Sequence, residues 1–438
     1  MHSKFLIFIG LFFISLLFIS CSQQEPTPNK TSKKLNASKK TFPEEDVYIL
    51  FALRAEQIQD NKSASELFSV LYEKSHKINY LYRSLNNDIV AKENQKVIDL
   101  VDEKTKASIS DPKLIRFKII ALIEMQKLDE AIVLSTELVK KTESIDDYIL
   151  LSDIYIKQRK YDIALKYLES AYVKDYNENV LDKMSIIMYV NLHRKKDAIA
   201  QLETHSRIKG CSKLICGRLV GFYSNENNID GTLETSLRLY NATKDEEVAK
   251  NIIQIYGYKK NYVKMISFLE KSKTDEETLL QLYIYTKNYQ KAFPLSDKLY
   301  SSSGDIAFLG QSAIYEYESS RNKDDMTVLN SVVRKLETVV KEDNSPIYKN
   351  YLGYVLIDHN LDVRKGMEYI KEVLTLEPNS AFYLDSLAWG YYKLDNCKKA
   401  KAIMDKVLTL EGGDDPEVRV HINQINDCLK NKKGANEK

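Results

Sequence analysis

Cysteine is the residue type in this sequence that offers the clearest chemistry. The chain has five cysteines, at Cys21, Cys211, Cys216, Cys397 and Cys428. The last four can pair as two disulfides, Cys211 with Cys216 and Cys397 with Cys428, if the chain folds in an oxidising compartment. The alternative is four free thiols, which pack as small apolar side chains. The choice between these states depends on where the chain is sent.

The sequence contains no recognisable motif of catalytic or metal-binding residues. The six histidines are scattered, at His2, His76, His193, His205, His359 and His421, and none belongs to an HExxH helix. No strand is followed by a GxSxG, P-loop or GxGxxG motif. His205 is the single histidine near Cys211 and Cys216, whose spacing differs from that of zinc ligands. We therefore expect no catalytic residue, no cofactor and no metal, and interpret the protein as not an enzyme.

The N-terminus indicates the compartment. Lys4 precedes an apolar run from Phe5 to Ile19, which is followed by Ser20 and Cys21. This is the layout of a secretory signal, and the run is too short for a comfortable membrane span. The alternative is a membrane anchor that stays uncleaved. The segment ending in Cys21 resembles the lipobox of bacterial lipoproteins.

That resemblance implies a signal peptide over residues 1–20 and acylation, for example with palmitate, of Cys21 as the first mature residue. The sequence departs from the usual pattern, because Leu17 lies one position before the expected leucine and Phe18 takes its place. Ser22, in place of an aspartate, implies the outer membrane, with the protein facing the periplasm. The polar residues that follow predict a flexible, lipid-anchored linker over 21–42.

The composition favours helices and excludes a general nucleic-acid binder. Glycine (14) and proline (8) are scarce among the 438 residues, which argues against a fold of strands and tight turns. Lys+Arg 64 nearly balances Asp+Glu 62, so the chain lacks the positive charge that phosphate binding requires. A chain of this length must contain several domains or grow by stacking repeats.

A repeat of about 34 residues is clearest from Ala381 onwards. Two runs of apolar residues at helical spacing are separated by a break at Asp395 and Asn396. Small residues, Ala388 and Ala400, would let the two helices approach closely. This unit resembles the tetratricopeptide repeat, whose signature positions fall on Leu384, Leu387, Ala388, Tyr391, Ala400, Met404 and Val407.

The resemblance implies an all-α fold, a right-handed superhelical solenoid of helix hairpins with a C-terminal capping helix. A plain helical bundle is the alternative. The predicted organisation is a degenerate helical region over 43–111, degenerate repeats over 112–304, an irregular helical pair over 305–345, two clear repeats over 346–411, a capping helix over 412–430 and a disordered tail over 431–438. An antiparallel cap would bring Cys428 back to Cys397.

Solenoids of this family bind partners in a concave groove lined by the first helix of each hairpin. The corresponding positions here are Asp153, Ile156, Lys157, Asn350, Tyr354, Ile357, Asp358, Asp385, Trp389, Tyr392 and Lys393. The alternative is that the charged residues form a solvated face and the apolar ones pack against neighbouring hairpins.

The expected function is protein binding in the bacterial periplasm. The last two repeats resemble envelope lipoproteins that include adaptors for a periplasmic carboxyl-terminal-processing protease. This implies a membrane-anchored adaptor whose partners are envelope proteins. The alternative is a structural component of an envelope machine, such as a flagellar motor or a secretion apparatus.

Overall fold

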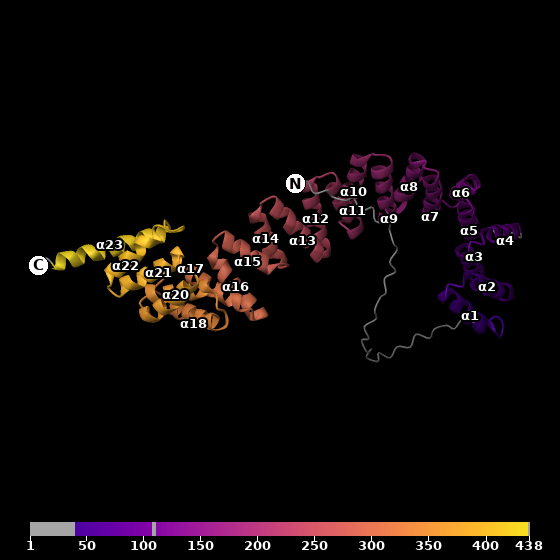
Figure 1. Cartoon of the computed structure of the whole chain (residues 1–438). Coiled ribbons are helices and arrows are strands. Elements are labelled where there is room, and N and C mark those ends of the chain that lie inside the picture. The colour runs from indigo at the N-terminus through magenta and orange to yellow at the C-terminus, as the bar shows by residue number, and fades with distance from the viewer. Residues whose placement is uncertain (1–39, 107–110, 437–438) are drawn as a thin grey trace. The chain divides into compact units, whose positions relative to one another are not determined.

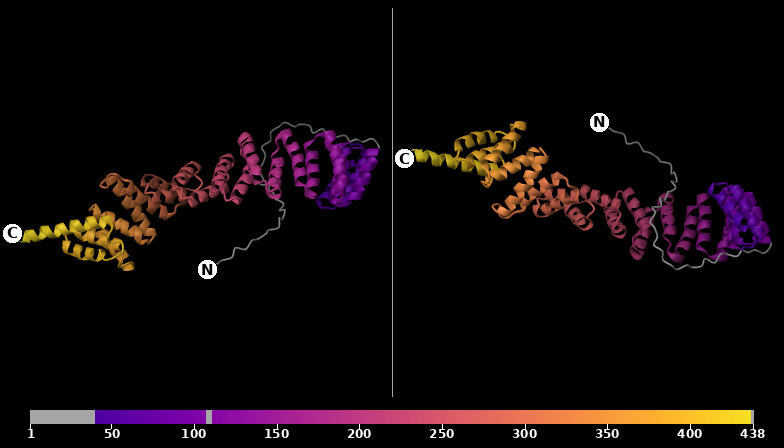
Figure 2. Two further views of the ribbon diagram at one scale, coloured as in Figure 1. Left: turned by 90° about the horizontal axis from the view of Figure 1, so that it is seen from above. Right: turned by 90° about the horizontal axis from the view of Figure 1, so that it is seen from below.

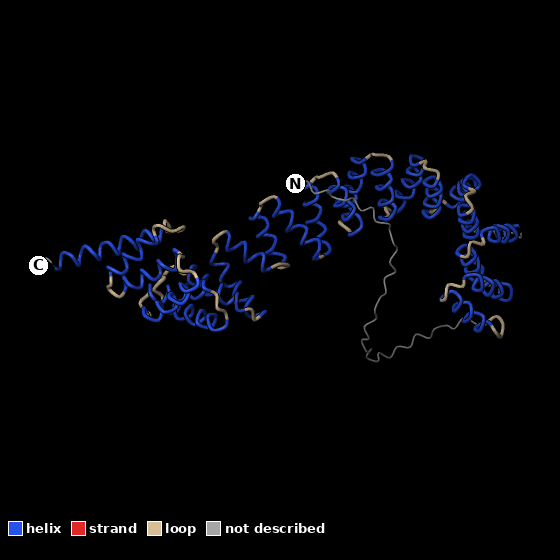
Figure 3. The backbone as a smooth tube through the Cα atoms, viewed as in Figure 1, coloured by secondary structure: helices blue, strands red, loops and turns tan. Residues whose placement is uncertain are grey.

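The computed structural model describes residues 40–106 and 111–436, and all regular structure in these ranges is helical (Figure 3). It contains 23 α-helices and a π-helical segment, which confirms the all-α prediction. The signal peptide, Cys21 and the linker up to residue 39 lie outside the described residues, so the lipid anchor stays a prediction. Within the described ranges, no helix is both long enough and apolar enough to cross a bilayer.

The chain divides into two compact units, and the boundary in the sequence falls between Ala171 and Tyr172. The helices of the first unit, with α8 continuing into the second, are α1 (Glu45–Gln57), α2 (Asn61–Ser75), α3 (Ile78–Val90), α4 (Asn94–Lys106), α5 (Pro112–Glu124), α6 (Leu128–Thr142), α7 (Ile145–Lys157) and α8 (Tyr161–Asp175). Consecutive helices run antiparallel and form hairpins that stack side by side (Figure 1).

The second unit repeats the same arrangement and ends in a single long helix. Its elements are α9 (Glu178–Ile186), the π-helical segment η1 (Ile187–Asn191), α10 (Lys195–Lys209), α11 (Lys213–Asn225), α12 (Ile229–Thr243), α13 (Glu246–Tyr258), α14 (Tyr262–Ser272), α15 (Glu276–Tyr285), α16 (Tyr289–Ser303), α17 (Ile306–Ser319), α18 (Met326–Glu342), α19 (Pro346–Asp358), α20 (Val363–Leu376), α21 (Ala381–Lys393), α22 (Cys397–Val407) and α23 (Pro416–Asn436). Both views in Figure 2 show α23, in yellow, beside the last hairpin, and it contacts α21 and α22.

A left-handed residue closes the turn of nearly every hairpin. First helices begin 30 to 40 residues apart, most of them 33 to 35. Ten of the eleven turns inside hairpins contain a non-glycine residue with φ between 51° and 63°, namely Gln59, Lys92, Gln126, Arg159, His193, Asn227, Lys260, Lys287, Asn360 and Asp395. Such a residue ends a helix and reverses the chain within a few residues. The exception is the predicted irregular pair, α17 and α18, whose connection is longer.

Two glycines let α19 and α20 approach closely. A Cβ atom added to Gly366 would lie 2.6 Å from the carbonyl oxygen of Gly353, and one added to Gly353 would lie 2.8 Å from that of Gly366. Both distances are below van der Waals contact, so any larger residue forces these backbones apart.

The structure differs from the sequence prediction at two other places. Segment η1 widens the first helix of its hairpin, and α23 continues to Asn436 where a disordered tail was expected after residue 430.

We expect the first hairpins to lose stability in acid because of Glu45. Burial alone would raise the pKa of this carboxyl, but hydrogen bonds from Lys77 Nζ (2.5 Å), Thr41 N–H (2.7 Å) and Tyr80 Oη (2.8 Å) lower it to about 2. Because the folded pKa lies below the ordinary 4.5, the ionised carboxyl stabilises the fold above pH 4.5. That contribution disappears as the pH falls from 4.5 towards 2.

Hydrogen exchange of α1–α3 at pH 6 and pH 3 measures this effect. The loss of protection from exchange between pH 6 and pH 3 should be smaller in Glu45→Gln than in the unmodified chain. Glu44→Gln, at the exposed neighbouring position, should lose as much protection as the unmodified chain does. An identical pH response in Glu45→Gln and the unmodified chain would contradict the prediction.

Candidate binding site at the C-terminal hairpins

The predicted groove residues of α7 lie on a partly accessible face. Asp153 and Ile156 are half-buried and Lys157 is exposed. The Nζ atom of Lys157 lies 4.0 Å from Oε1 of Glu124 in α5, the first helix of the preceding hairpin. These three positions therefore belong to a row of first helices, as predicted.

A cavity lies among the first helices of the C-terminal hairpins. It has a volume of about 500 Å³ and opens between α17, α19, α21 and α23. Its walls are formed by Tyr317, Glu318, Lys323, Asn350, Tyr351, Tyr354, Asp358, Phe382, Asp385, Ser386 and Glu417. Four of the predicted groove residues, Asn350, Tyr354, Asp358 and Asp385, are thus brought together. This volume is within the range of about 300–1,000 Å³ that is typical of ligand pockets.

Two other predicted groove residues are part of the core, which corrects that expectation. Ile357 is fully buried and packs with Met367, Ile370 and Trp389. Trp389 is only 4% exposed, and its ring centroid lies 4.0 Å from that of His421 in α23. Ile357 is enclosed by α20 and α21, because Met367 and Ile370 belong to α20 and Trp389 belongs to α21. Trp389 is covered by α23, through the stacked ring of His421.

Asp385 is likewise occupied by the capping helix. It is 7% exposed, and its Oδ2 atom lies 2.9 Å from Nδ1 of His421. The carboxyl oxygen accepts a hydrogen bond from the imidazole, so this predicted groove residue holds α23 in place instead of facing open solvent. Glu417, one turn earlier in α23, accepts a hydrogen bond of 2.5 Å from Tyr354 Oη.

Asp358 connects the buried part of the site to the cavity. Its Oδ1 atom accepts a hydrogen bond of 2.8 Å from the indole N–H of Trp389, and its carbonyl oxygen accepts one of 2.5 Å from Lys393 Nζ. The rings of Tyr392 and Trp389 are stacked, with centroids 4.6 Å apart. Tyr392 and Lys393 are half-buried and support Asp358 and Trp389, although neither lines the cavity.

Three tyrosines line the cavity, Tyr317 from α17 and Tyr351 and Tyr354 from α19. Burial raises the pKa of Tyr317, Tyr351 and Tyr354, and neighbouring carboxylates add to the effect. Tyr351 donates a hydrogen bond of 2.6 Å to Glu318. The Nζ atom of Lys323 lies 4.1 Å from the Tyr317 ring centroid and donates to the Tyr317 carbonyl at 2.5 Å.

Sequence reasoning did not find the residues that come from α17, its following loop and α23. Tyr317, Glu318 and Lys323 belong to the irregular pair, and Glu417 belongs to the cap. A usable signal was present in the sequence, because Tyr317 lies in the last turn of one first helix, and Tyr351 and Tyr354 lie one turn apart on the next first helix.

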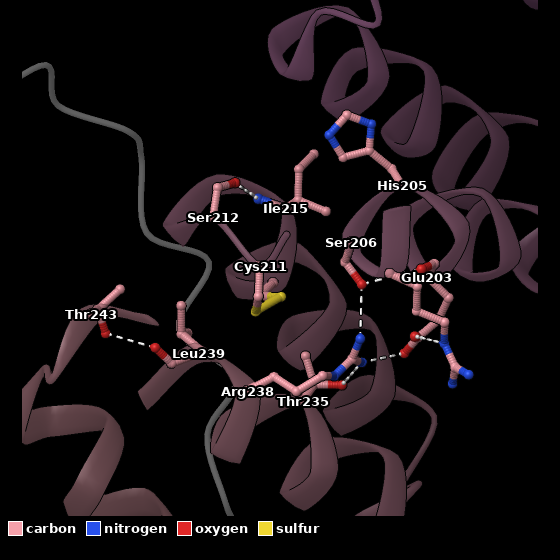
Figure 4. Close-up of a disulfide and its surroundings, with 12 residues drawn as sticks. Glu203, His205, Ser206, Cys211, Ser212, Ile215, Thr235, Arg238, Leu239 and Thr243 are labelled. Carbon is pink, nitrogen blue, oxygen red and sulfur yellow. Dashed lines mark hydrogen bonds and ion pairs between the residues drawn. A yellow bond between two sulfur atoms is a disulfide. The ribbon is translucent and has the colours of Figure 1, made fainter. Parts of the chain in front are cut away.

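The structure joins the cysteines in the two pairs that the sequence suggested, Cys211 with Cys216 and Cys397 with Cys428. Cys211 and Cys216 bridge the entry to α11, with Cα atoms 5.5 Å apart (Figure 4). Nearby, Arg238 of α12 donates hydrogen bonds to Ser206 (2.8 Å) and Glu203 (2.7 Å) of α10. Cys397, at the start of α22, is bonded to Cys428 of α23, with Cα atoms 6.1 Å apart. The second bridge therefore ties the capping helix to the hairpin that it covers.

Asp395 lies beside this second bridge, with Oδ1 4.0 Å from the sulfur of Cys397 and 3.9 Å from that of Cys428. In the described residues this is a group that could hold a metal ion only if the cysteines were reduced. Thiolates are the sulfur ligands that metals bind, and sulfurs joined in a disulfide cannot supply them.

Comparisons with known proteins give only distant structural similarity. No protein-family model matches the sequence, and no curated protein matches it. Among solved structures, the chain is similar to the Cut9–Hcn1 hetero-tetramer of APC/C (TM-score 0.39, 11% identity, covering 89% of this chain and 96% of that one). It is also similar to Naa15/Naa10 bound to HypK-THB (TM-score 0.28, 10% identity, covering 86% and 65%). A third similarity is to YrrB, a TPR protein with an unusual peptide-binding site (TM-score 0.34, 13% identity, covering 42% and 95%). Because these TM-scores are low, the assignment of a helix-hairpin repeat rests on this chain's own hairpins, with their spacing of about 34 residues and their left-handed turns.

Proposed function

We propose that this protein is a scaffold of the bacterial envelope that is lipid-anchored at Cys21 and binds other proteins through its C-terminal hairpins. The observation that carries the binding role is the cavity between α17, α19, α21 and α23, because it gathers first-helix residues from three successive hairpins. The anchor rests on the signal-like N-terminus and the lipobox-like segment. An adaptor for a periplasmic protease is the more specific form of this proposal.

Photocrosslinking in intact cells tests the binding role. Phe382 lines the cavity and is 59% exposed, so a photoreactive residue at this position can reach a docked partner. Val263, 80% exposed on the second helix of another hairpin, is the matched control. We expect one identified envelope protein to be crosslinked from position 382 and not from position 263. Equal crosslinking from both positions, no crosslinking, or an adduct with a second copy of this chain would overturn the proposal.

The anchor and the type of scaffold have separate tests. Cys21→Ala should move the protein from the membrane fraction to the soluble fraction and remove its acyl label. A mature chain that is unlipidated and cytoplasmic would contradict the proposal. Deleting the gene should cause protease substrates to accumulate if the protein is an adaptor. Failure of an envelope machine to assemble would instead indicate a structural component.

A further inference from the structure

We propose that the cavity between α17, α19, α21 and α23 binds an arginine side chain of the partner protein. The inference rests on the proposed function and adds the chemistry of the contact to it. It is independent of the identity of the partner and of the lipid anchor.

Charge is the first reason. Four carboxyl groups line the cavity, from Glu318, Asp358, Asp385 and Glu417, whereas Lys323 is the one lysine or arginine among the lining residues. Lys323 Nζ lies 3.4 Å from the Glu318 carboxylate, and Lys393 Nζ, outside the lining, lies 3.5 Å from that of Asp358. Asp385 is engaged by His421, whereas Glu318 and Glu417 accept hydrogen bonds from tyrosines and remain exposed at the rim. A hollow surface with this excess of negative charge attracts a cationic group and disfavours an anionic one.

The aromatic walls narrow the choice of cation. Tyr317, Tyr351, Tyr354 and Phe382 surround the same space. One contact of a cation with an aromatic ring is already present, since the ammonium nitrogen of Lys323 lies 4.1 Å from the Tyr317 ring centroid. A guanidinium group is planar and weakly hydrated, so it stacks on aromatic rings and pairs with carboxylates at the same time. A lysine ammonium is a strongly hydrated point charge and gains less from such walls.

A hydrogen-bond acceptor without a partner in the cavity favours a ligand that carries many hydrogen-bond donors. Asn350 lines the cavity, and its Oδ1 atom is shielded from solvent without a hydrogen-bond partner. A buried carbonyl oxygen without a partner costs free energy that a ligand N–H can recover. A guanidinium group has five N–H donors and no acceptor, which matches a site of carboxylates, hydroxyl oxygens and one amide oxygen.

The single tryptophan of the chain provides the measurement. Trp389 donates its indole hydrogen bond to Asp358, which lines the cavity, so a ligand on that carboxyl will change the Trp389 fluorescence. We would titrate the full-length chain in detergent with N-acetyl-arginine methylamide. The neutral citrulline derivative has nearly the same shape, and the lysine derivative has the same charge. We expect saturable binding of the arginine probe, at least tenfold weaker binding of the lysine probe, and no saturation with citrulline.

Variants at the rim locate the binding. Glu318→Gln combined with Glu417→Gln should weaken arginine binding at least tenfold, because both carboxylates are exposed and line the cavity. Glu368→Gln removes an exposed carboxylate from α20, outside the cavity, and should leave binding unchanged. Far-UV circular dichroism of each variant verifies that the helices are intact. Added salt should weaken binding of the arginine probe, since the attraction is partly screened.

Several outcomes would overturn the inference. These are equal binding of arginine and citrulline probes, lysine binding as tight as arginine, or unchanged affinity in the double variant. If the arginine probe fails while position 382 still crosslinks a partner in cells, the proposed function stands and the inference is wrong. If the probe binds but no partner is crosslinked, the arginine site stands and the proposed function fails.

Discussion

Replacing Trp389 with alanine is expected to lower the free energy of unfolding of the last two hairpins by about 3–5 kcal/mol. The indole is 4% exposed and is stacked between Tyr392 of its own helix and His421 of α23. Its removal leaves a cavity at the junction of α19, α21 and α23 and leaves Asp358 without its indole donor. Loss of packing and loss of a buried hydrogen bond therefore act together.

Urea unfolding followed by circular dichroism, with hydrogen exchange of α21–α23, measures this loss. Phe382→Ala removes another aromatic residue from the same helix, but its side chain is 59% exposed, so we expect a change within about 0.5 kcal/mol. Trp389→Phe should fall between the two, because it keeps an aromatic ring and loses the hydrogen bond. Comparable unfolding curves for Trp389→Ala and Phe382→Ala would show that α23 does not rest on the indole.

Removing the bridge between Cys397 and Cys428 is expected to cost about 3–4 kcal/mol, from the loop entropy of a bridge of this span. The two cysteines are 31 residues apart, and the bridge joins the start of α22 to α23. Because contacts in a repeat protein are mostly between neighbours, the loss should be confined to α23 and the hairpin beneath it. Hydrogen exchange of α23 in Cys397→Ser combined with Cys428→Ser measures this local opening.

The other disulfide is the internal control for this prediction. Cys211 and Cys216 are only 5 residues apart, so the same entropy argument gives about 2 kcal/mol. Converting both to serine should leave exchange in α23 unchanged and should affect only the hairpins around α11. Faster exchange in α23 after loss of the Cys211–Cys216 bridge would contradict the entropy argument. An unchanged exchange rate in α23 after loss of the Cys397–Cys428 bridge would contradict it as well. Mass mapping under non-reducing conditions tests both pairings directly.

The helix pattern could be predicted because its signals are local. In the unit beginning at Ala381, apolar residues recur three and four positions apart and therefore share one face of each helix. Four of them lie in one core cluster, namely Leu384, Ala388, Ala400 and Met404. The predicted break at Asp395 is where the structure has a left-handed residue between α21 and α22. Each of these features depends on residues that lie within a few turns of one another.

The lining of the candidate cavity could be predicted only in part. Asn350, Tyr354 and Asp358, chosen for their places on a first helix, line the cavity, and their contact with a partner stays a prediction. The expectation of an accessible face was wrong for Ile357 and Trp389, which are buried. A periodic pattern identifies which side of a helix faces away from its hairpin partner. It does not indicate whether another segment of the same chain will cover that side.

The order of amino acids by itself determined the helices, their pairing into hairpins and the repeat of about 34 residues, because these follow from spacing within a hairpin. Only the tertiary structure decided that α23 lies over the last first helix and completes an acidic, tyrosine-lined cavity. The contacts responsible join residues far apart in sequence, since Asp385 and His421 are 36 positions apart and Tyr354 and Glu417 are 63 positions apart. Such pairs leave no periodic trace in the sequence, since each forms once, after the hairpins have already stacked.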